Sequence, residues 1–267
     1  MVKRVFSALA AATVLFLSAY FGQANGVAIL CGLVAVGSIF EYSRLTLGTL
    51  DASEYIRLAF LILTLISELT IVFFGISGMA VLPVAVILFA TIILISIRTV
   101  DDLRQGFLIH TSGTLGFLYV GVFPALVIRL LFFENGLKWF FGFLLIVFAG
   151  DTFAYFSGIL FGRHKLHEVV SPKKTIEGAI GSLVGSSAAG FLLHTALPDS
   201  QLVFILLLSI TTGVFAQIGD LFESQLKRIA GVKDSGSIMP GHGGVLDRLD
   251  GVLFSAPVFY LLLTCLH

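Results

Sequence analysis

Four acidic side chains near the C-terminal end of the sequence have the spacing of a cation-binding site. Asp220 and Glu223 are three residues apart in AQIGDLFESQLKR, and Asp247 and Asp250 are three apart in PGHGGVLDRLDG. Residues with this spacing lie on one face of a helix, and carboxylate oxygens are the ligands that hard divalent cations prefer. The pattern indicates oxygen ligands for a cation, although an ordinary ion pair with Lys227 explains Glu223 equally well.

Basic residues and glycines close to these carboxylates indicate phosphate binding. Gly243 and Gly244 permit a tightly turned backbone that presents N–H groups to an anion. Ser171 and the proline after it are typical of a helix N-cap and first helical residue, which predicts that Lys173 and Lys174 occupy the first helical turn. Lysines beside free backbone N–H groups form an anion site, although positive charge that flanks a membrane span explains them as well. Together, these groups are what phosphoryl or nucleotidyl transfer requires.

The elements that must position these residues are long apolar segments. Hydrophobic residues make up 57% of the 267 residues and charged residues only 12%, and the mean hydropathy is +1.04, whereas soluble proteins carry about 25% charged residues. Apolar runs of roughly 17–25 residues cross a bilayer as helices, and these runs lack the alternation of a membrane barrel. We predict an all-α, polytopic integral membrane protein with about nine transmembrane helices: residues 5–21, 26–42, 57–75, 79–97, 109–131, 138–161, 176–196, 201–222 and 251–266.

The basic residues divide unequally between the two sides of such a bundle. Of the 16 lysines and arginines, only Arg129 and Lys138 fall outside the N-terminus and the loops after the second, fourth, sixth and eighth spans. The positive-inside rule places the basic side in the cytoplasm, and we expect the polar site at that face. The first apolar run follows Lys3 and Arg4 as a signal peptide would, but it lacks a clean small-x-small cleavage site, so we expect a retained span.

Ionisable residues inside apolar spans are candidates for function because they are costly there. Asp151 follows a glycine in the sixth span, and we expect it to support the site. Glu68 and Arg129 are isolated. We expect a protonated or hydrogen-bonded Glu68 inside the bundle, and an Arg129 side chain that extends to the far interface. Cys31 and Cys265 lie within spans and are expected to be packing residues.

No repeat or linker divides the chain, so we predict one membrane domain over residues 1–267. Residues 1–137 carry few ionisable residues within their spans and are expected to be mainly scaffold helices. Residues 138–267 are expected to supply the catalytic helices and the cytoplasmic loops.

Two segments resemble the signatures of the phosphatidate cytidylyltransferases, the family that makes CDP-diacylglycerol. SPKKTIEG, residues 171–178, is similar to the motif Ser-Pro-Lys-Lys-Thr-aromatic-Glu-Gly, with Ile176 at the aromatic position. The C-terminal signature has an apolar residue before its proline, and here that residue is Met239. It is matched at Ser224, Leu226, Lys227, Arg228, Lys233, Asp234, Gly236, Pro240, His242, Gly243, Gly244, Asp247, Arg248 and Asp250. The match covers roughly residues 151–251, and the first 140 residues agree only in hydropathy.

The resemblance implies a magnesium-dependent reaction in which CTP and phosphatidic acid give CDP-diacylglycerol and pyrophosphate. It implies that Asp220 and Asp247 bind Mg²⁺, with K⁺ as a second cation. The expected catalytic residues are Lys173, Lys174, Asp220, Asp247 and Asp250, with Asp151 and Glu223 in support. The expected substrate-binding residues are Ser171, Lys227, Arg228, Lys233, Asp234, His242, Gly243, Gly244 and Arg248.

The expected partners are CTP, phosphatidic acid and membrane lipid, with no nucleic acid. The expected location is a bacterial inner membrane with the site facing the cytoplasm, and the oligomeric state stays open, a homodimer included. One alternative is a CTP-dependent kinase of a lipid alcohol, such as polyprenol or phytol. Another is a secondary transporter, which predicts internal symmetry between halves that the sequence lacks.

Overall fold

The computed structural model describes residues 2–237 and 243–265. In chain order the elements are α1 (Val2–Leu45), α2 (Glu54–Phe74), η1 (Gly75–Ala80), α3 (Val81–Ser96), α4 (Val100–Gly116), η2 (Phe117–Val122), α5 (Phe123–Leu130), α6 (Gly136–Phe161), β1 (Lys165–His167), β2 (Ser171–Thr175), α7 (Ile176–Ala196), α8 (Leu202–Ile229) and α9 (Leu246–Thr264).

The chain forms two compact units, and the glycine-rich segment, residues 235–246 of which 235–237 and 243–246 are described, belongs with the first helices. The N-terminal unit is Met1–Arg129 with Ile229–Asp247, and the C-terminal unit is Leu130–Arg228 with Arg248–His267. The sequence placed the glycine-rich segment in the half expected to be catalytic. A division of roles at residues 137 and 138 stays a prediction.

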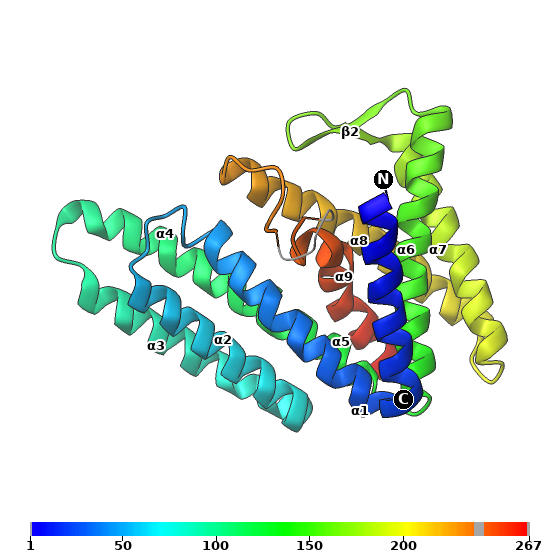
Figure 1. Ribbon diagram of the computed structural model, residues 1–267, viewed down its shortest axis with the longest axis horizontal. Helices are drawn as coiled ribbons and strands as arrows, with labels where there is room; N and C mark the ends of the chain where they lie inside the picture. The colour runs from blue at the N-terminus through cyan, green and yellow to red at the C-terminus, as the bar shows by residue number, and fades with distance from the viewer. Residues whose placement is uncertain (1, 238–242, 266–267) are drawn as a thin grey trace. The chain divides into compact units, whose positions relative to one another are not determined.

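An aromatic core holds the N-terminal unit together. α2 packs against α1, α3 and η2, and α2 and α3 lie side by side in Figure 1. The rings of Tyr42, Phe60, Phe89 and Phe117 lie with centroids 5.5–6.1 Å apart. The Tyr42 hydroxyl donates to the Ser112 carbonyl at 2.8 Å, which satisfies the polar end of this buried ring. This core fixes the C-terminal end of α1.

Small residues form the helix contacts of the C-terminal unit. α6 and α7 run side by side (Figure 1), with Gly150 of α6 against Ser186 of α7. The Ser186 hydroxyl donates to the Ile146 carbonyl at 3.1 Å. Gly251 of α9 lies against Ala216 of α8. Such residues let membrane helices approach closely and bond across their interface, so α6, α8 and α9 bring polar side chains within reach of one another.

Residues 165–175 form a short hairpin that the all-helical prediction did not include. β1 and β2 are antiparallel, with Lys165 opposite Thr175 and His167 opposite Ser171, and the hairpin stands beside the label β2 in Figure 1. Pro172 is compatible with this strand, because proline favours extended backbone at the residue before it.

The start of α7 corrects the predicted helix N-terminus. α7 begins after Thr175, whose hydroxyl accepts a hydrogen bond from the Gly178 N–H at 3.1 Å, and threonine is a favourable N-cap. The prediction that Ser171 is the cap, with Lys173 and Lys174 in the first helical turn, is therefore wrong. Both lysines lie on strand β2, before α7 begins.

The described residues contain six helical stretches that are long and apolar enough to cross a membrane: Leu9–Leu45, Glu54–Ser96, Val100–Leu130, Gly136–Phe161, Ile176–Ala196 and Leu202–Ile229. Over the described residues the chain is therefore an α-helical integral membrane protein with one short hairpin, while a count of nine spans is not confirmed. The first two stretches have 37 and 43 residues, and one crossing needs only about 20. The first contains a break at Gln23, with φ of 51°, between the first two predicted spans.

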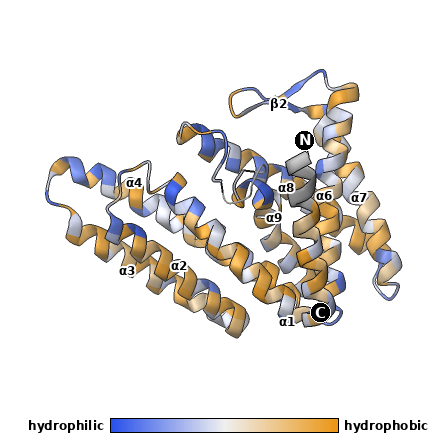
Figure 2. Ribbon diagram, viewed as in Figure 1, coloured by the Kyte–Doolittle hydropathy of each residue, from blue (hydrophilic) through white to orange (hydrophobic). Residues whose placement is uncertain are grey.

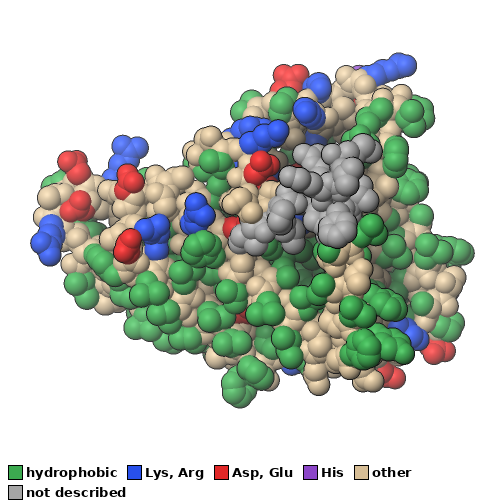
Figure 3. Space-filling view, viewed as in Figure 1, with side chains coloured by type: hydrophobic (Ala, Val, Ile, Leu, Met, Phe, Trp, Pro, Cys, Tyr) green, Lys and Arg blue, Asp and Glu red, His purple; other side chains and the backbone are tan. Residues whose placement is uncertain are grey.

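The surface agrees with a membrane location. In Figure 2, α2 and α3 are hydrophobic along most of their length. Hydrophobic side chains also cover much of the face drawn in Figure 3, and many large ones are exposed, among them Phe73, Ile95 and Phe107. A soluble chain rarely exposes apolar patches of this extent, whereas lipid solvates them.

Candidate active site

Lys174 of β2 and Asp220 of α8 form an ion pair in the C-terminal unit. Lys174 Nζ lies 2.6 Å from Asp220 Oδ2, and the two side chains are 24% and 38% exposed. Ser224, one turn further along α8, donates to Asp220 Oδ1 at 3.4 Å. Because both charged groups are partly open to their surroundings, a charged ligand can reach this pair.

Two further aspartates of the C-terminal unit interact with this pair. The carboxyl group of Asp250 in α9 interacts with the charges of Asp220 and Lys174. Asp151 in α6 interacts with the same two charges. Like charges at close quarters destabilise one another, and three carboxylates outnumber Lys174. This group of four residues is called the acidic cluster below.

Asp247, in the first turn of α9, binds the glycine-rich segment within the N-terminal unit. Its Oδ2 accepts hydrogen bonds from the Ser235 N–H at 2.9 Å, the Ser235 hydroxyl at 3.0 Å and the Gly244 N–H at 2.8 Å. Gly243 has φ of +87°, which glycine adopts without strain. These bonds fix the direction of the Asp247 carboxyl group, and the Gly244 N–H expected to bind an anion binds a protein carboxylate here.

Glu41 in α1 is a carboxylate that the sequence analysis missed. It is 2% exposed, and it accepts hydrogen bonds from Ser235 and Leu246, which lie 194 and 205 residues further along the chain. One signal was present, because Glu41 is an ionisable residue at the end of the predicted span 26–42 and such residues are costly in a membrane.

Glu223 and Lys227 form the ion pair that was the alternative to a site role. Lys227 Nζ lies 2.5 Å from Glu223 Oε2, and the side chains are 17% and 0% exposed, respectively. The ion pair is thus confirmed, with Glu223 buried and Lys227 half-buried. Participation of Glu223 or Lys227 in the reaction stays a prediction.

The hairpin that carries Lys174 is fastened at both ends. The Glu177 carboxylate accepts from the N–H groups of Arg163 and His164 at 3.1 and 3.2 Å and lies 2.6 Å from His164 Nδ1. At the tip of the hairpin, Arg228 Nε donates to the Val170 carbonyl at 3.4 Å. The sequence analysis gave Glu177 no role, although it is the glutamate of SPKKTIEG.

The other expected substrate-binding residues are placed as follows. Ser171 is half-buried on β2, and Lys173 is exposed on the same strand. Lys233, Asp234 and Arg248 are exposed. His242 lies outside the described residues, so its expected contact with the triphosphate stays a prediction.

The two aspartates expected to share Mg²⁺ belong to different units, Asp220 to the C-terminal and Asp247 to the N-terminal one, and their sharing of a cation stays a prediction. Over residues 2–237 and 243–265, no three side chains of His, Cys, Asp or Glu form a metal-binding group. Mg²⁺ is commonly held by one or two carboxylates together with substrate phosphates and water. A site that a nucleotide completes therefore needs no such group.

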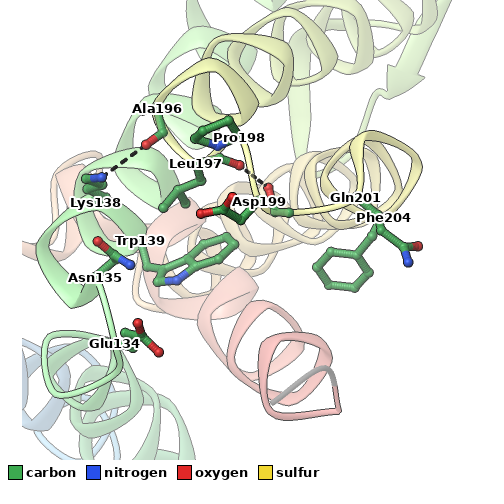
Figure 4. A pocket seen from close by; sticks show the side chains of 11 residues that line it. Glu134, Asn135, Lys138, Trp139, Ala196, Leu197, Pro198, Asp199, Gln201 and Phe204 are labelled. Carbon is green, nitrogen blue, oxygen red and sulfur yellow. Dashed lines mark hydrogen bonds between the residues drawn. The ribbon is translucent and has the colours of Figure 1, made fainter.

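A pocket of about 430 Å³ lies between the start of α6 and the α7–α8 loop (Figure 4). Its charged residues are Glu134, Lys138 and Asp199. The Lys138 ammonium donates to the Ala196 carbonyl at 3.1 Å, which satisfies an acceptor at the C-terminal end of α7. The residues expected to take part in the reaction do not line this pocket, and we assign it no part in the reaction.

Comparisons with known proteins identify the family. The model of the cytidylyltransferase family matches residues 2–266. The phosphatidate cytidylyltransferase of Staphylococcus haemolyticus is 45% identical over 131 residues, which are 49% of this chain and 50% of that protein. The protein of the same name from Bacillus subtilis is 38% identical over 192 residues, 71% of this chain and 69% of that protein. The one from Thermotoga maritima is 36% identical over 187 residues, 68% of this chain and 69% of that protein. The chain thus aligns with half of the first of these relatives and with about two thirds of the others.

Proposed function

This chain belongs to the cytidylyltransferase family, and we propose that it is a phosphatidate cytidylyltransferase. It transfers a cytidylyl group from CTP to phosphatidic acid, forms CDP-diacylglycerol and releases pyrophosphate. The acidic cluster carries the proposal, because it joins a lysine and three carboxylates in a unit that is otherwise largely apolar. The names of the relatives support phosphatidic acid as the acceptor.

The reaction exchanges one phosphoanhydride linkage for another. A phosphate oxygen of phosphatidic acid forms a bond to the α-phosphorus of CTP. The bond from that phosphorus to the α–β bridging oxygen breaks, and its electron pair leaves with pyrophosphate. The attacking phosphate is already an anion, so no side chain need act as the nucleophile. The protein must bring two anions together and stabilise the charge that develops.

Lys174 is the lysine of the acidic cluster. Successive residues of a strand point to opposite faces, so Lys173 and Lys174 cannot both point at Asp220. The ion pair with Asp220 holds the Lys174 ammonium in place before CTP binds, and a preorganised cation stabilises phosphate charge without reorganisation during the reaction. Lys173, which is exposed, is free to approach a phosphate from solvent.

Mg²⁺ is the proposed cofactor, held by Asp220, Asp247 and phosphate oxygens of CTP. When bound, it polarises the phosphates and neutralises their charge as a Lewis acid. The donors fit this ion, because carboxylate oxygens are hard ligands and Asp220 already has a cation, the Lys174 ammonium, 2.6 Å from its oxygen. Asp151 and Asp250 add carboxylates for K⁺ as a second cation.

The proposed location is a bacterial inner membrane, with the acidic cluster facing the cytoplasm. The excess of Lys and Arg in the loops on that side supports this orientation. The relatives named above come from bacteria. A site at this face also lets the phosphate of phosphatidic acid, at the leaflet surface, meet a soluble nucleotide.

The test is turnover by purified protein in detergent with phosphatidic acid, labelled CTP and Mg²⁺. Asp220→Asn keeps the shape of the side chain but removes its charge, and we expect kcat to fall by more than about 100-fold, the usual effect of losing one preorganised charge-stabilising group. Asp247→Asn should behave alike. Asp199→Asn, an exposed aspartate of the α7–α8 loop, is the matched control and should keep wild-type activity.

The products decide between the proposed function and a lipid-alcohol kinase. The cytidylyltransferase releases pyrophosphate and places the label in lipid, whereas a kinase releases CDP. Near-normal turnover by Asp220→Asn across a magnesium titration would show that the metal assignment is wrong.

A further inference from the structure

Glu41, near the C-terminal end of α1, is a buried carboxylate that contacts both ends of the glycine-rich segment. It is 2% exposed. Its Oε2 accepts hydrogen bonds from the Ser235 hydroxyl at 3.1 Å and from the Leu246 N–H at 3.0 Å. A charged group is rarely buried without such partners. The carboxylate therefore joins the start of the segment, at Ser235, to its end, at Leu246.

Two glycines of the segment lie directly against this carboxylate. A side-chain carbon at Gly236 would collide with Glu41 Oε1, and one at Gly244 would collide with Glu41 Oε2. The backbone of the segment therefore encloses the carboxylate from two sides. This packing gives a physical reason for glycine at both positions that is independent of any ligand.

Ser235 links Glu41 to Asp247. The Ser235 hydroxyl oxygen lies 3.1 Å from Glu41 Oε2 and 3.0 Å from Asp247 Oδ2. A hydroxyl has one proton and can donate to one carboxylate at a time. Displacing Glu41 therefore changes the hydrogen bonding of Asp247, even though the two carboxylates belong to helices far apart in the sequence.

Glu41 also serves the N-terminus of α9. Leu246 is the first residue of α9, and the first N–H groups of a helix have no partner within the helix. An acidic group at this end is favourable because of the helix dipole. Glu41 accepts the Leu246 N–H, so it fixes the helix end on which Asp247 is the next residue.

We propose that Glu41 is a positioning residue for the reaction: it holds Ser235, Gly244 and Leu246 so that the Asp247 carboxylate keeps the direction in which it binds the cation. The inference rests on the proposed function. Glu41 acts through Ser235 and the backbone, and it is the contribution of the N-terminal helices to the site, which the sequence analysis expected to be scaffold.

Two substitutions separate this role from simple stabilisation of the fold. Glu41→Gln keeps one oxygen that can accept both hydrogen bonds, but it places an amide NH₂ at the other position and removes the charge. Ser235→Ala removes only the link between the two carboxylates and leaves Glu41 in place. Glu68→Gln is the matched control, because Glu68 is also 2% exposed and lies in α2 of the same unit.

The experiment measures two properties of the protein in detergent with CTP and without phosphatidic acid, because CTP phosphates complete the proposed cation site. Mn²⁺ affinity is measured by electron paramagnetic resonance, and hydrogen exchange is measured for the amides of Gly244 and Leu246. We expect Glu41→Gln and Ser235→Ala to weaken Mn²⁺ binding by about 10–100-fold, as loss of a group that orients a metal ligand usually does. The two amides should exchange at least about 10-fold faster in Glu41→Gln, because their acceptors are disturbed. Glu68→Gln should change neither property.

Both effects must occur together. Unchanged Mn²⁺ affinity, with or without faster exchange, would overturn the proposal, because Glu41 would then only stabilise the segment. Weaker Mn²⁺ binding with unchanged exchange would overturn it too, because the effect would not pass through the segment. If Glu41→Gln does not fold, Ser235→Ala decides by Mn²⁺ affinity alone.

The wild-type protein distinguishes this proposal from the proposed function. If wild-type protein neither binds Mn²⁺ nor turns over CTP, the proposed function and its metal fail. If it does both and the two variants match it, only the role of Glu41 fails.

Discussion

Replacing Lys174 by methionine should damage the reaction far more than it damages the fold. Lys174 Nζ lies 2.6 Å from Asp220 Oδ2, and the two side chains are 24% and 38% exposed. At this distance the bare attraction is about 6 kcal/mol in an effective dielectric of about 20. Desolvation, side-chain entropy and screening leave about 1 kcal/mol or less for such partly exposed pairs. Methionine keeps most of the apolar stem, so the free energy of unfolding should fall by about 1 kcal/mol.

The expected loss of activity of Lys174→Met is much larger than its loss of stability. A preorganised cation that stabilises phosphate charge contributes about 10²–10³-fold to kcat, whereas 1 kcal/mol corresponds to about a fivefold change in any equilibrium. The assay measures kcat and KM for CTP per folded protein, together with a thermal melt. Lys138→Met is the matched control, because Lys138 belongs to the same unit and donates only to the Ala196 carbonyl as far as the described contacts go. If kcat/KM of Lys174→Met falls by less than about fivefold, Lys174 has only a structural role and the acidic cluster is not the phosphate site.

Two further predictions concern packing and charge. Gly236→Ala should lower the free energy of unfolding by about 1–3 kcal/mol, the usual effect of overpacking, because the new carbon collides with the Glu41 carboxyl. Gly32→Ala should not lower it, because the structure leaves open space at Gly32. Equal melting temperatures of these two variants would contradict this packing. Glu223→Ala should lower the free energy of unfolding by about 3–5 kcal/mol, because it leaves the largely buried Lys227 without that carboxylate. Changing both residues to leucine should lower it much less. Chemical denaturation of both variants checks this, and equal losses would refute it.

Two of the long hydrophobic helices could be predicted from the sequence almost to the residue. The predicted spans 138–161 and 176–196 correspond to α6 (Gly136–Phe161) and α7 (Ile176–Ala196), because a run of apolar residues bounded by polar ones is a strong local signal. The family expected from SPKKTIEG and the C-terminal signature is confirmed by the family model. The separation predicted between the first two spans coincides with the break of α1 at Gln23. The polar residues near Gln23 break the hydropathy, but the chain bends there and continues as helix.

The hairpin and the N-cap of α7 were not predicted because the same residues fit two different local structures. Ser171 before a proline fits a helix N-cap, and it also fits extended backbone. Thr175, three residues before Gly178, fits a cap equally well. In the structure Ser171 lies in a strand and Thr175 caps the helix. One reason lies in residues outside the motif. Arg228 of α8 reaches the hairpin tip, a contact between distant segments that no local pattern contains.

The acidic cluster follows from helix packing rather than from proximity in sequence. Each of its three aspartates stands next to a glycine that is buried in a helix contact: Gly150 against Ser182 and Ser186, Gly219 against Phe254, and Gly251 against Ala216. Adjacent residues on a helix point about 100° apart. When the glycine faces the neighbouring helix, the aspartate next to it therefore lies at the edge of the helix contact. Without side chains on the glycines, the helices approach closely enough for the aspartates to interact. The same contacts hold like charges together against their repulsion, so a larger residue at any of these glycines would relieve the repulsion by separating the three aspartates.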